Sequence, residues 1–152
     1  MTVKPIPENY PRITPYLSIK GASDAIEFYK KAFGATERMR IAEPNGKVGH
    51  AEIEIAGGLI MLADEYPQIG FRSPASLGGS PVVIHMYVED VDAFCAKAVA
   101  EGATLTKPVS DQFYGDRSGQ LSDPFGHMWS VATHKEDLSA DEMQKRAAAL
   151  HG

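Results

Sequence analysis

An internal repeat constrains the fold more than any other feature of this sequence. The tripeptide Gly34-Ala35-Thr36 recurs as Gly102-Ala103-Thr104, 68 residues later (102 − 34). Each copy follows a segment with the apolar spacing of an amphipathic helix, and that segment follows a run of alternating residues typical of a strand. A half-chain of this size is too small to bury a sheet alone. We therefore expect a duplicated unit whose two copies pack together.

The first copy begins with signals for a strand and a helix. Residues 12–19 alternate between two faces, which predicts a strand, and Pro15 favours a sheet edge or a bulge for it. The apolar spacing that follows predicts a helix with Ser23 or Asp24 as its N-cap and Gly34 as its stop. The chain is therefore expected to enter the repeat as a strand followed by a helix.

The rest of the repeat is a set of strands. The segment 44–46, Pro-Asn-Gly, indicates a type I′ turn between two strands, and the apolar run 59–63 supplies a fourth. The second copy follows the same order, with a strand over 82–88, a helix capped by Asp90 and a last strand over 128–132. Each copy is therefore a βαβββ module.

We expect an α+β fold in which one domain, residues 1–152, contains both modules. The modules span approximately 10–65 and 81–134, and the Pro- and Gly-rich segment 66–80 connects them. A capping box predicts a C-terminal helix over 139–150.

The composition excludes several classes of protein. The hydrophobic fraction of 43% indicates a folded core, and the net charge of −5 argues against a nucleic-acid partner. No apolar run approaches membrane-spanning length and no signal-peptide pattern is visible, which favours a cytoplasmic protein with no membrane partner. The single cysteine, Cys95, excludes an internal disulfide and a cysteine-based zinc cluster.

Three segments carry a resemblance to a known family: ITPYLSIKGASDAIEFYKKAFGA, VVIHMYVEDVDAFCAKAVAEGA and SDPFGHMWSVATH. They resemble the vicinal oxygen chelate superfamily, which includes glyoxalase I, extradiol dioxygenases and bleomycin resistance proteins. The segments LGGSP and DQFYGDR add a likeness to its PhnB-like subgroup. The resemblance implies curved mixed sheets around a central cavity, and a homodimer.

The resemblance also implies where a metal ion would bind. Metal-dependent members hold a divalent ion with a histidine or a carboxylate at four strand positions. In this sequence those positions correspond to Thr14, about Met61, Val83 and Ser130. Thioether and hydroxyl groups are weak ligands for such ions, and valine has no donor. Glyoxalase I and extradiol dioxygenase activities are therefore disfavoured, and no cofactor is expected.

Four polar residues on strand faces are candidates for chemistry. His85 and Tyr16 occupy equivalent places in the two modules and are the candidate catalytic pair for acid–base work. His50 and Glu52 share a strand face, and with His85 they offer a displaced divalent-metal site as an alternative. The structural alternatives are a histidine satisfied by its neighbours and a solvated strand face.

Loop aromatics and arginines complete the candidate site. Tyr66 and Phe71 lie on the connector, where they either contact a planar or apolar ligand or seal the module interface. Arg117 is a candidate for an anionic ligand group, although its neighbour Asp116 would neutralise it. The candidate ligand contacts are Tyr16, His50, Glu52, Phe71, Arg72, His85, Tyr87, Phe113, Tyr114, Arg117 and Ser130. We expect His127, His134 and His151 at the surface.

These features favour a protein that binds a small molecule in a metal-free cavity. The alternative is a lyase, isomerase or oxygenase of the same superfamily that uses a displaced divalent metal or His85 as general base. A third possibility is a protein-interaction module that uses an apolar patch on residues 64–81.

Overall fold

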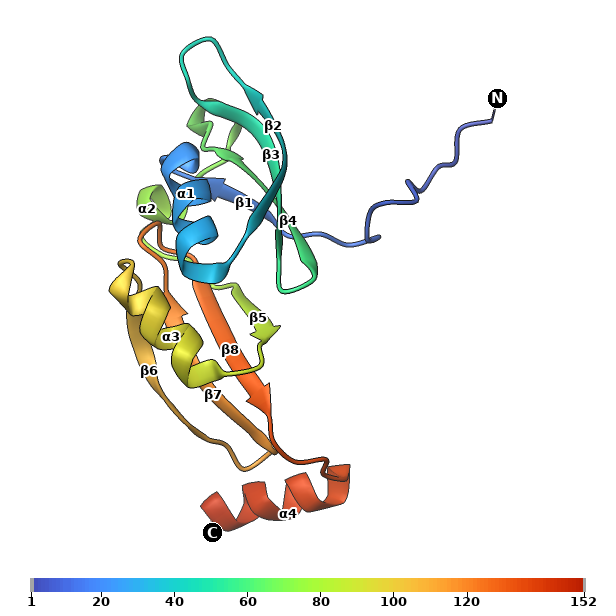
Figure 1. Cartoon of the computed structure of the whole chain (residues 1–152), viewed down its shortest axis with the longest axis vertical. Coiled ribbons are helices and arrows are strands. Elements are labelled where there is room, and N and C mark those ends of the chain that lie inside the picture. The colour runs from blue at the N-terminus through green and yellow to red at the C-terminus, as the bar shows by residue number, and fades with distance from the viewer. Residues whose placement is uncertain (1, 152) are drawn as a thin grey trace. The chain divides into compact units, whose positions relative to one another are not determined.

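The computed structural model in Figure 1 describes residues 2–151. Its contacts divide the chain into two compact units, one ending at Gly78 and the other beginning at Gly79. Each unit contains one four-stranded mixed sheet with a helix packed on it, as expected for an α+β fold.

The first unit contains four strands and two α-helices: β1 (Tyr16–Ile19), α1 (Ala22–Phe33), β2 (Thr36–Ala42), β3 (Val48–Ile55), β4 (Gly58–Asp64) and α2 (Pro74–Leu77), with a short 3-10 helix, η1 (Pro67–Ile69), before α2. Its strand order is β1-β4-β3-β2, with β1 parallel to β4 and the other pairs antiparallel. The edge position that Pro15 favoured is confirmed, but the strand begins only after that proline.

The second unit repeats this plan with β5 (Val83–Tyr87), α3 (Val91–Ala100), β6 (Thr104–Asp111), β7 (Asp116–Ser122), β8 (Met128–His134) and α4 (Ala140–His151). Its strand order is β5-β8-β7-β6. The parallel pairs also correspond. Tyr16 lies opposite Met61 and His85 lies opposite Ser130, an offset of 69 in both cases (85 − 16 and 130 − 61). The predicted βαβββ duplication is therefore confirmed.

Helix α1 forms the core of the first unit because one of its faces is apolar. Ile26 and Tyr29 on this face are fully buried, as are Ile53 and Leu62 of the sheet. Gly34 ends the helix in the left-handed conformation (φ 69°), as predicted, and its N–H donates to the carbonyl of Tyr29. Full burial of such side chains stabilises a fold by about 1.5–3 kcal/mol each.

Helix α3 covers the second sheet in the same way. Trp129, Leu121 and Val91 are almost completely buried in this unit. Cys95 is also buried, and this burial raises the pKa of its thiol, which makes it an inert core residue as expected.

The N-cap predicted for the first helix is wrong. Neither Ser23 nor Asp24 caps α1. Its N-cap is Gly21, which has no side chain. The carboxylate of Asp64, at the end of β4, accepts hydrogen bonds from the N–H groups of Gly21 (3.1 Å) and Ala22 (3.0 Å). A residue more than forty positions away in sequence thus satisfies the start of this helix.

The predicted type I′ turn is also wrong. That turn needs positive φ at two central residues, but among residues 2–151 the one non-glycine with positive φ is Ala56. Pro44 fixes a negative φ. The N–H of Gly46 (φ 86°) donates to the carbonyl of Glu43 at 2.9 Å, which makes a three-residue hairpin loop with glycine in the left-handed position.

The expected surface position of His127 is wrong too, since this residue is only 8% exposed. It lies in the loop between β7 and β8, which the side chain of Asp123 draws inward. Asp123 Oδ1 accepts from the N–H groups of Phe125 (2.9 Å) and His127 (3.0 Å), and its Oδ2 accepts from Trp129 Nε1 (2.9 Å).

The C-terminal helix is present with its predicted cap. Ser139 Oγ accepts from the N–H of Glu142 at 3.1 Å, one residue before α4 begins. None of the helices within residues 2–151 is both long enough and apolar enough to cross a membrane.

Candidate functional site

The first unit contains a cavity of about 460 Å³. Strands β1, β3 and β4, the loop between β2 and β3 and the loop after β4 supply its wall. The wall is mostly apolar and consists of Tyr16, Glu43, Val48, Gly49, Ala63, Asp64, Tyr66, Ile69 and Phe71. A volume of several hundred cubic ångströms with aromatic walls is typical of small-molecule sites.

The aromatic wall depends on a small closed loop. Tyr66 and Phe71 pair through two backbone hydrogen bonds, with N···O distances of 2.6 and 3.2 Å, and Gly70 turns the chain between them with a positive φ of 81°. The Phe71 ring meets the ring of Tyr16 edge-on, with 5.7 Å between centroids. The connector aromatics and the first-strand tyrosine are therefore brought together, whereas Arg72 is exposed and does not line the cavity.

A chain of hydrogen bonds starts at the cavity wall. The hydroxyl of Tyr16 lies 2.7 Å from Nδ1 of His50, and Nε2 of His50 lies 2.9 Å from Oε2 of Glu52. The hydroxyl of Tyr10 donates to the other carboxylate oxygen at 2.8 Å. Strand pairing across β1, β4 and β3 produces this alignment, because each of these side chains except Tyr10 is on a strand.

Glu52 is the buried end of this chain, with 3% of its surface exposed. Burial raises the pKa of its carboxyl, but the hydrogen bonds from His50 and Tyr10 outweigh that effect and hold the pKa below its usual value. Arg38 adds a positive charge, with Nε 4.0 Å from the carboxylate and its guanidinium 4.5 Å from the centre of the Tyr10 ring. The pKa of Tyr16 is raised by burial and by the charge of Glu52.

Sequence reasoning missed Tyr10 and Arg38. Tyr10 precedes the first strand in a segment without periodicity, so no pattern places it over β3. Arg38 lies on β2 at a register irregularity between Glu37 and Met39, which changes the simple alternation of faces.

In the second unit, the place equivalent to Tyr16 is occupied by His85, and its surroundings differ from those of Tyr16. Nδ1 of His85 lies 2.9 Å from the hydroxyl of Ser130, and its ring meets that of Tyr87 at 4.9 Å between centroids. Tyr87 donates to Asp116 at 2.8 Å.

A cavity of about 150 Å³ in this unit is lined by Lys107, Gln112, Tyr114, Ser118, Gly119, Gln120 and Ser130. Of the predicted contacts, Tyr114 and Ser130 therefore lie together, while the ring of Phe113 lies against that of Tyr114 at 5.2 Å between centroids.

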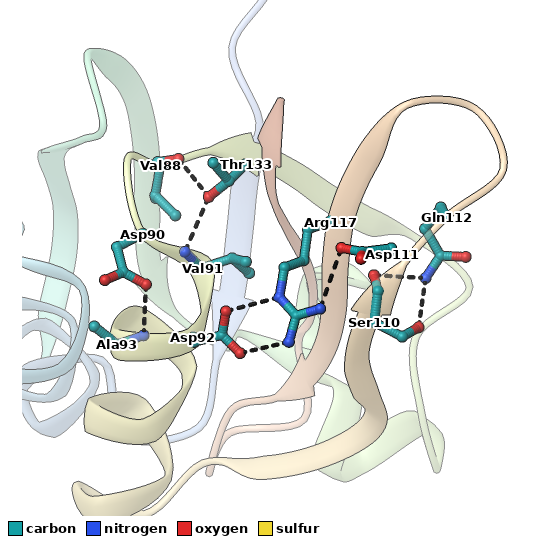
Figure 2. A network of polar contacts seen from close by, with 10 residues as sticks. All are labelled: Val88, Asp90, Val91, Asp92, Ala93, Ser110, Asp111, Gln112, Arg117 and Thr133. Atoms are coloured by element: carbon teal, nitrogen blue, oxygen red, sulfur yellow. Dashed lines mark hydrogen bonds and ion pairs between the residues drawn. The ribbon is translucent and has the colours of Figure 1, made fainter. Parts of the chain in front are cut away.

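Arg117 is held by two carboxylates, as Figure 2 shows. Its guanidinium binds Asp92 in a bidentate manner at 2.8 and 2.9 Å and Asp111 at 3.1 Å, and these contacts raise its pKa further. The predicted neutralisation by Asp116 is wrong, because consecutive residues of β7 point to opposite faces of the sheet. A role for Arg117 in ligand binding stays a prediction.

The residues at the family's metal positions do not fit a divalent ion. Met61 offers only a thioether, and Val83 offers no donor atom. The hydroxyl of Ser130 is already hydrogen-bonded to His85. Within residues 2–151, no group of three or more histidine, cysteine or acidic side chains has the arrangement to hold a metal. The residues of the alternative, displaced metal site belong to both units: His50 and Glu52 to the first and His85 to the second. This metal site stays a prediction.

His134 gives the second unit a pH-dependent contact. Its Nδ1 lies 2.8 Å from Asp116 and its Nε2 lies 2.7 Å from Asp137, and these hydrogen bonds raise its pKa above the ordinary value of 6.5. The stabilisation is therefore complete below the unfolded-state pKa and is lost as the pH rises through the folded-state pKa. We expect His134→Gln to lower the melting temperature more at about pH 5.5 than at about pH 8.5.

Differential scanning calorimetry at both pH values measures this difference. The control is His151→Gln, which changes an exposed histidine on α4 and should have the same small effect at each pH. An equal loss for His134→Gln at both pH values would contradict the assignment.

The sequence of this chain is similar to those of known proteins. The family model described as the Glyoxalase/Bleomycin resistance protein/Dioxygenase superfamily matches residues 13–131. An uncharacterized protein of Mycobacterium tuberculosis, Rv0887c, is 45% identical over 137 residues, which cover 88% of this chain and 81% of that protein.

Solved structures are similar as well. The crystal structure of the Arabidopsis thaliana protein At5g48480 superposes with a TM-score of 0.66 at 29% identity, covering 81% of this chain and 98% of that one. A PhnB protein from Bacillus cereus, described as a putative 3-demethylubiquinone-9 3-methyltransferase, gives a TM-score of 0.64 at 20% identity, with 81% and 99% covered. The latter similarity supports the fold alone.

Proposed function

Because the chain belongs to the Glyoxalase/Bleomycin resistance protein/Dioxygenase superfamily, we propose that it uses the family scaffold to bind a small, largely apolar molecule without a metal ion. The cavity of the first unit is the binding site. The observation that carries the proposal is this cavity of about 460 Å³, in which Tyr16, Tyr66 and Phe71 form an aromatic wall.

The charges around the cavity narrow the class of ligand. Glu43 and Asp64 are the ionisable acids in its lining, and no lysine or arginine is among the lining residues. Asp64 already accepts three backbone hydrogen bonds, including one from the N–H of Val48 at 2.7 Å. An anionic ligand would meet negative charge without a compensating cation. A neutral molecule with an aromatic group therefore fits best.

Binding without a metal is supported by the side chains at the four family positions, which offer no strong ligand. Membership of the PhnB-like subgroup is part of the proposal, and its support is the likeness of the LGGSP and DQFYGDR segments. The homodimer, the cytoplasmic location and the use of His85 as a general base stay predictions.

We expect Phe71→Ala to weaken ligand binding about tenfold, because an aromatic contact contributes about 0.5–1.5 kcal/mol beyond its buried area and the loss of that apolar area adds to this. A thermal-shift screen of neutral aromatic, cationic and anionic compounds identifies the ligand class, and isothermal titration of the strongest compound then measures Kd for each variant. Neutral aromatic compounds should give the largest shifts.

The matched control is Phe94→Ala, which removes a phenyl ring from α3 of the second unit. It should leave Kd unchanged. A melting curve that no compound shifts, or an equal Kd for wild type and Phe71→Ala, would reject the aromatic cavity as the binding site.

A further inference from the structure

We propose that the cavity of the first unit selects neutral aromatic molecules that carry an O–H or N–H group, and that Glu52 sets this preference through His50 and Tyr16. This inference rests on the proposed function, because it concerns how that same cavity distinguishes one neutral ligand from another. It goes further by naming the polar group that the ligand carries and the residue that determines the choice.

The carboxylate of Glu52 determines which nitrogen of His50 carries the proton. Burial raises the pKa of this carboxyl, but hydrogen bonds from His50 and Tyr10 outweigh that effect and hold the pKa below its usual value, so the group is ionised and only accepts. Nε2 of His50, 2.9 Å from Oε2 of Glu52, is therefore the donor. In a neutral imidazole the other nitrogen, Nδ1, then has a lone pair and no proton.

The lone pair on Nδ1 in turn orients the hydroxyl of Tyr16. The hydroxyl oxygen lies 2.7 Å from Nδ1, so its proton is donated to His50. Burial and the charge of Glu52 raise the pKa of Tyr16, which keeps this proton on the oxygen. Turning the proton toward a ligand would leave Nδ1 without this partner, and water reaches His50 only in part, since its side chain is 23% exposed. The Tyr16 oxygen therefore offers a ligand a lone pair and not a proton.

The other polar groups of the cavity favour the same kind of ligand. Glu43 and Asp64 present carboxylate oxygens, which accept hydrogen bonds, and no side chain in the lining carries an N–H group. The hydroxyl of Tyr66 rotates and can either accept or donate, so it does not discriminate. A phenol or an indole can therefore make a hydrogen bond to Tyr16 that an aromatic ether or ketone cannot make.

A comparison of neutral bicyclic probes tests this preference. Indole only donates, benzofuran has the same shape with an oxygen in place of the N–H, and 1-indanone only accepts. Isothermal titration at about pH 8 measures Kd for each probe. The ratio of the benzofuran Kd to the indole Kd should be about 3- to 10-fold larger for the wild type than for Tyr16→Phe, which keeps the ring but removes the acceptor. Comparing ratios cancels the difference in hydration between the probes.

Glu52→Gln tests the residue that sets the preference. Tyr10 and Arg38 both face Oε1 of Glu52, so the amide oxygen of the glutamine takes that place and its NH2 group faces Nε2 of His50. The imidazole proton then moves to Nδ1, which donates to Tyr16 and leaves the Tyr16 proton free for a ligand. The ratio of the 1-indanone Kd to the indole Kd should fall by about threefold or more.

The matched control is Glu54→Gln, which changes an exposed glutamate on the same strand and should keep the wild-type ratio. 15N NMR of His50 reports the tautomer directly, and the proton should be on Nε2 in the wild type and on Nδ1 in Glu52→Gln. Because Glu52 is buried, its replacement can unfold the protein. The comparison with Tyr16→Phe stands in that case, since Tyr16 is 45% exposed.

The outcomes separate this inference from the proposed function. Equal Kd ratios for the wild type and Tyr16→Phe, or a wild-type His50 with its proton on Nδ1, would overturn the preference and leave binding in the cavity intact. An unchanged ratio in folded Glu52→Gln would overturn the role of Glu52. If none of the probes binds, the proposed function fails, and the inference that rests on it fails too.

Discussion

Replacing Asp123 with alanine is expected to destabilise the second unit by about 3–5 kcal/mol. The carboxylate of Asp123 is 4% exposed and accepts from the N–H groups of Phe125 and His127 and from Nε1 of Trp129. Alanine removes this acceptor from a loop in which His127 and Trp129 are buried. An unsatisfied buried donor costs about 1–3 kcal/mol.

Urea denaturation followed by tryptophan fluorescence measures the loss directly, because Trp129 is the single tryptophan of the chain and is buried in this unit. Asp123→Asn keeps one carbonyl acceptor and should lie between wild type and alanine. The control is Asp141→Ala, at an exposed position in the first turn of α4, with an expected change below about 1 kcal/mol. A free energy of unfolding for Asp123→Ala within that margin of the wild type would show that the loop does not depend on this carboxylate.

The architecture could be predicted because it is encoded in local patterns. Alternation and helical spacing are read over a few residues, and the same order occurs twice. The equivalence of Tyr16 and His85 also followed from sequence, and the strand registers confirm it. What the periodicity could not provide is which side chain satisfies a given backbone group when the two are distant in sequence.

The same distinction applies to the candidate site: local patterns predicted some of its residues, and contacts between distant segments place the others. Alternation placed His50 and Glu52 on one strand face, and the pairing of β3 with β4 and of β4 with β1 carries that face to Tyr16. Tyr10 could not be predicted, because it reaches Glu52 from a segment without regular structure. The aromatic loop lay between these cases, since its rings were visible in the sequence but their position over the sheet depends on the backbone pairing of Tyr66 with Phe71.

The start of α1 is the clearest case of a distant partner, and it yields the second large effect. Asp64→Ala removes the acceptor for the N–H groups of Gly21 and Ala22 and for that of Val48. Loss of a helix cap costs about 0.5–2 kcal/mol, and the N–H of Val48, a fully buried residue, adds a further penalty. We expect the first unit to lose about 2–3 kcal/mol.

The one tryptophan of the chain, Trp129, lies in the second unit, so its fluorescence does not report on the first. Amide hydrogen exchange of α1 measures the loss of stability in the first unit instead. Protection of the Ala25 and Ile26 amides should fall about 30- to 100-fold in Asp64→Ala. The matched control is Asp24→Ala, which removes an acidic side chain from the first turn of α1 that makes no cap hydrogen bond. If Asp24→Ala lowered protection as much as Asp64→Ala, the helix would be capped locally. A larger effect at Asp64 would instead mean that β4 stabilises the start of α1, so that the wall of the cavity and the helix behind it are stabilised together.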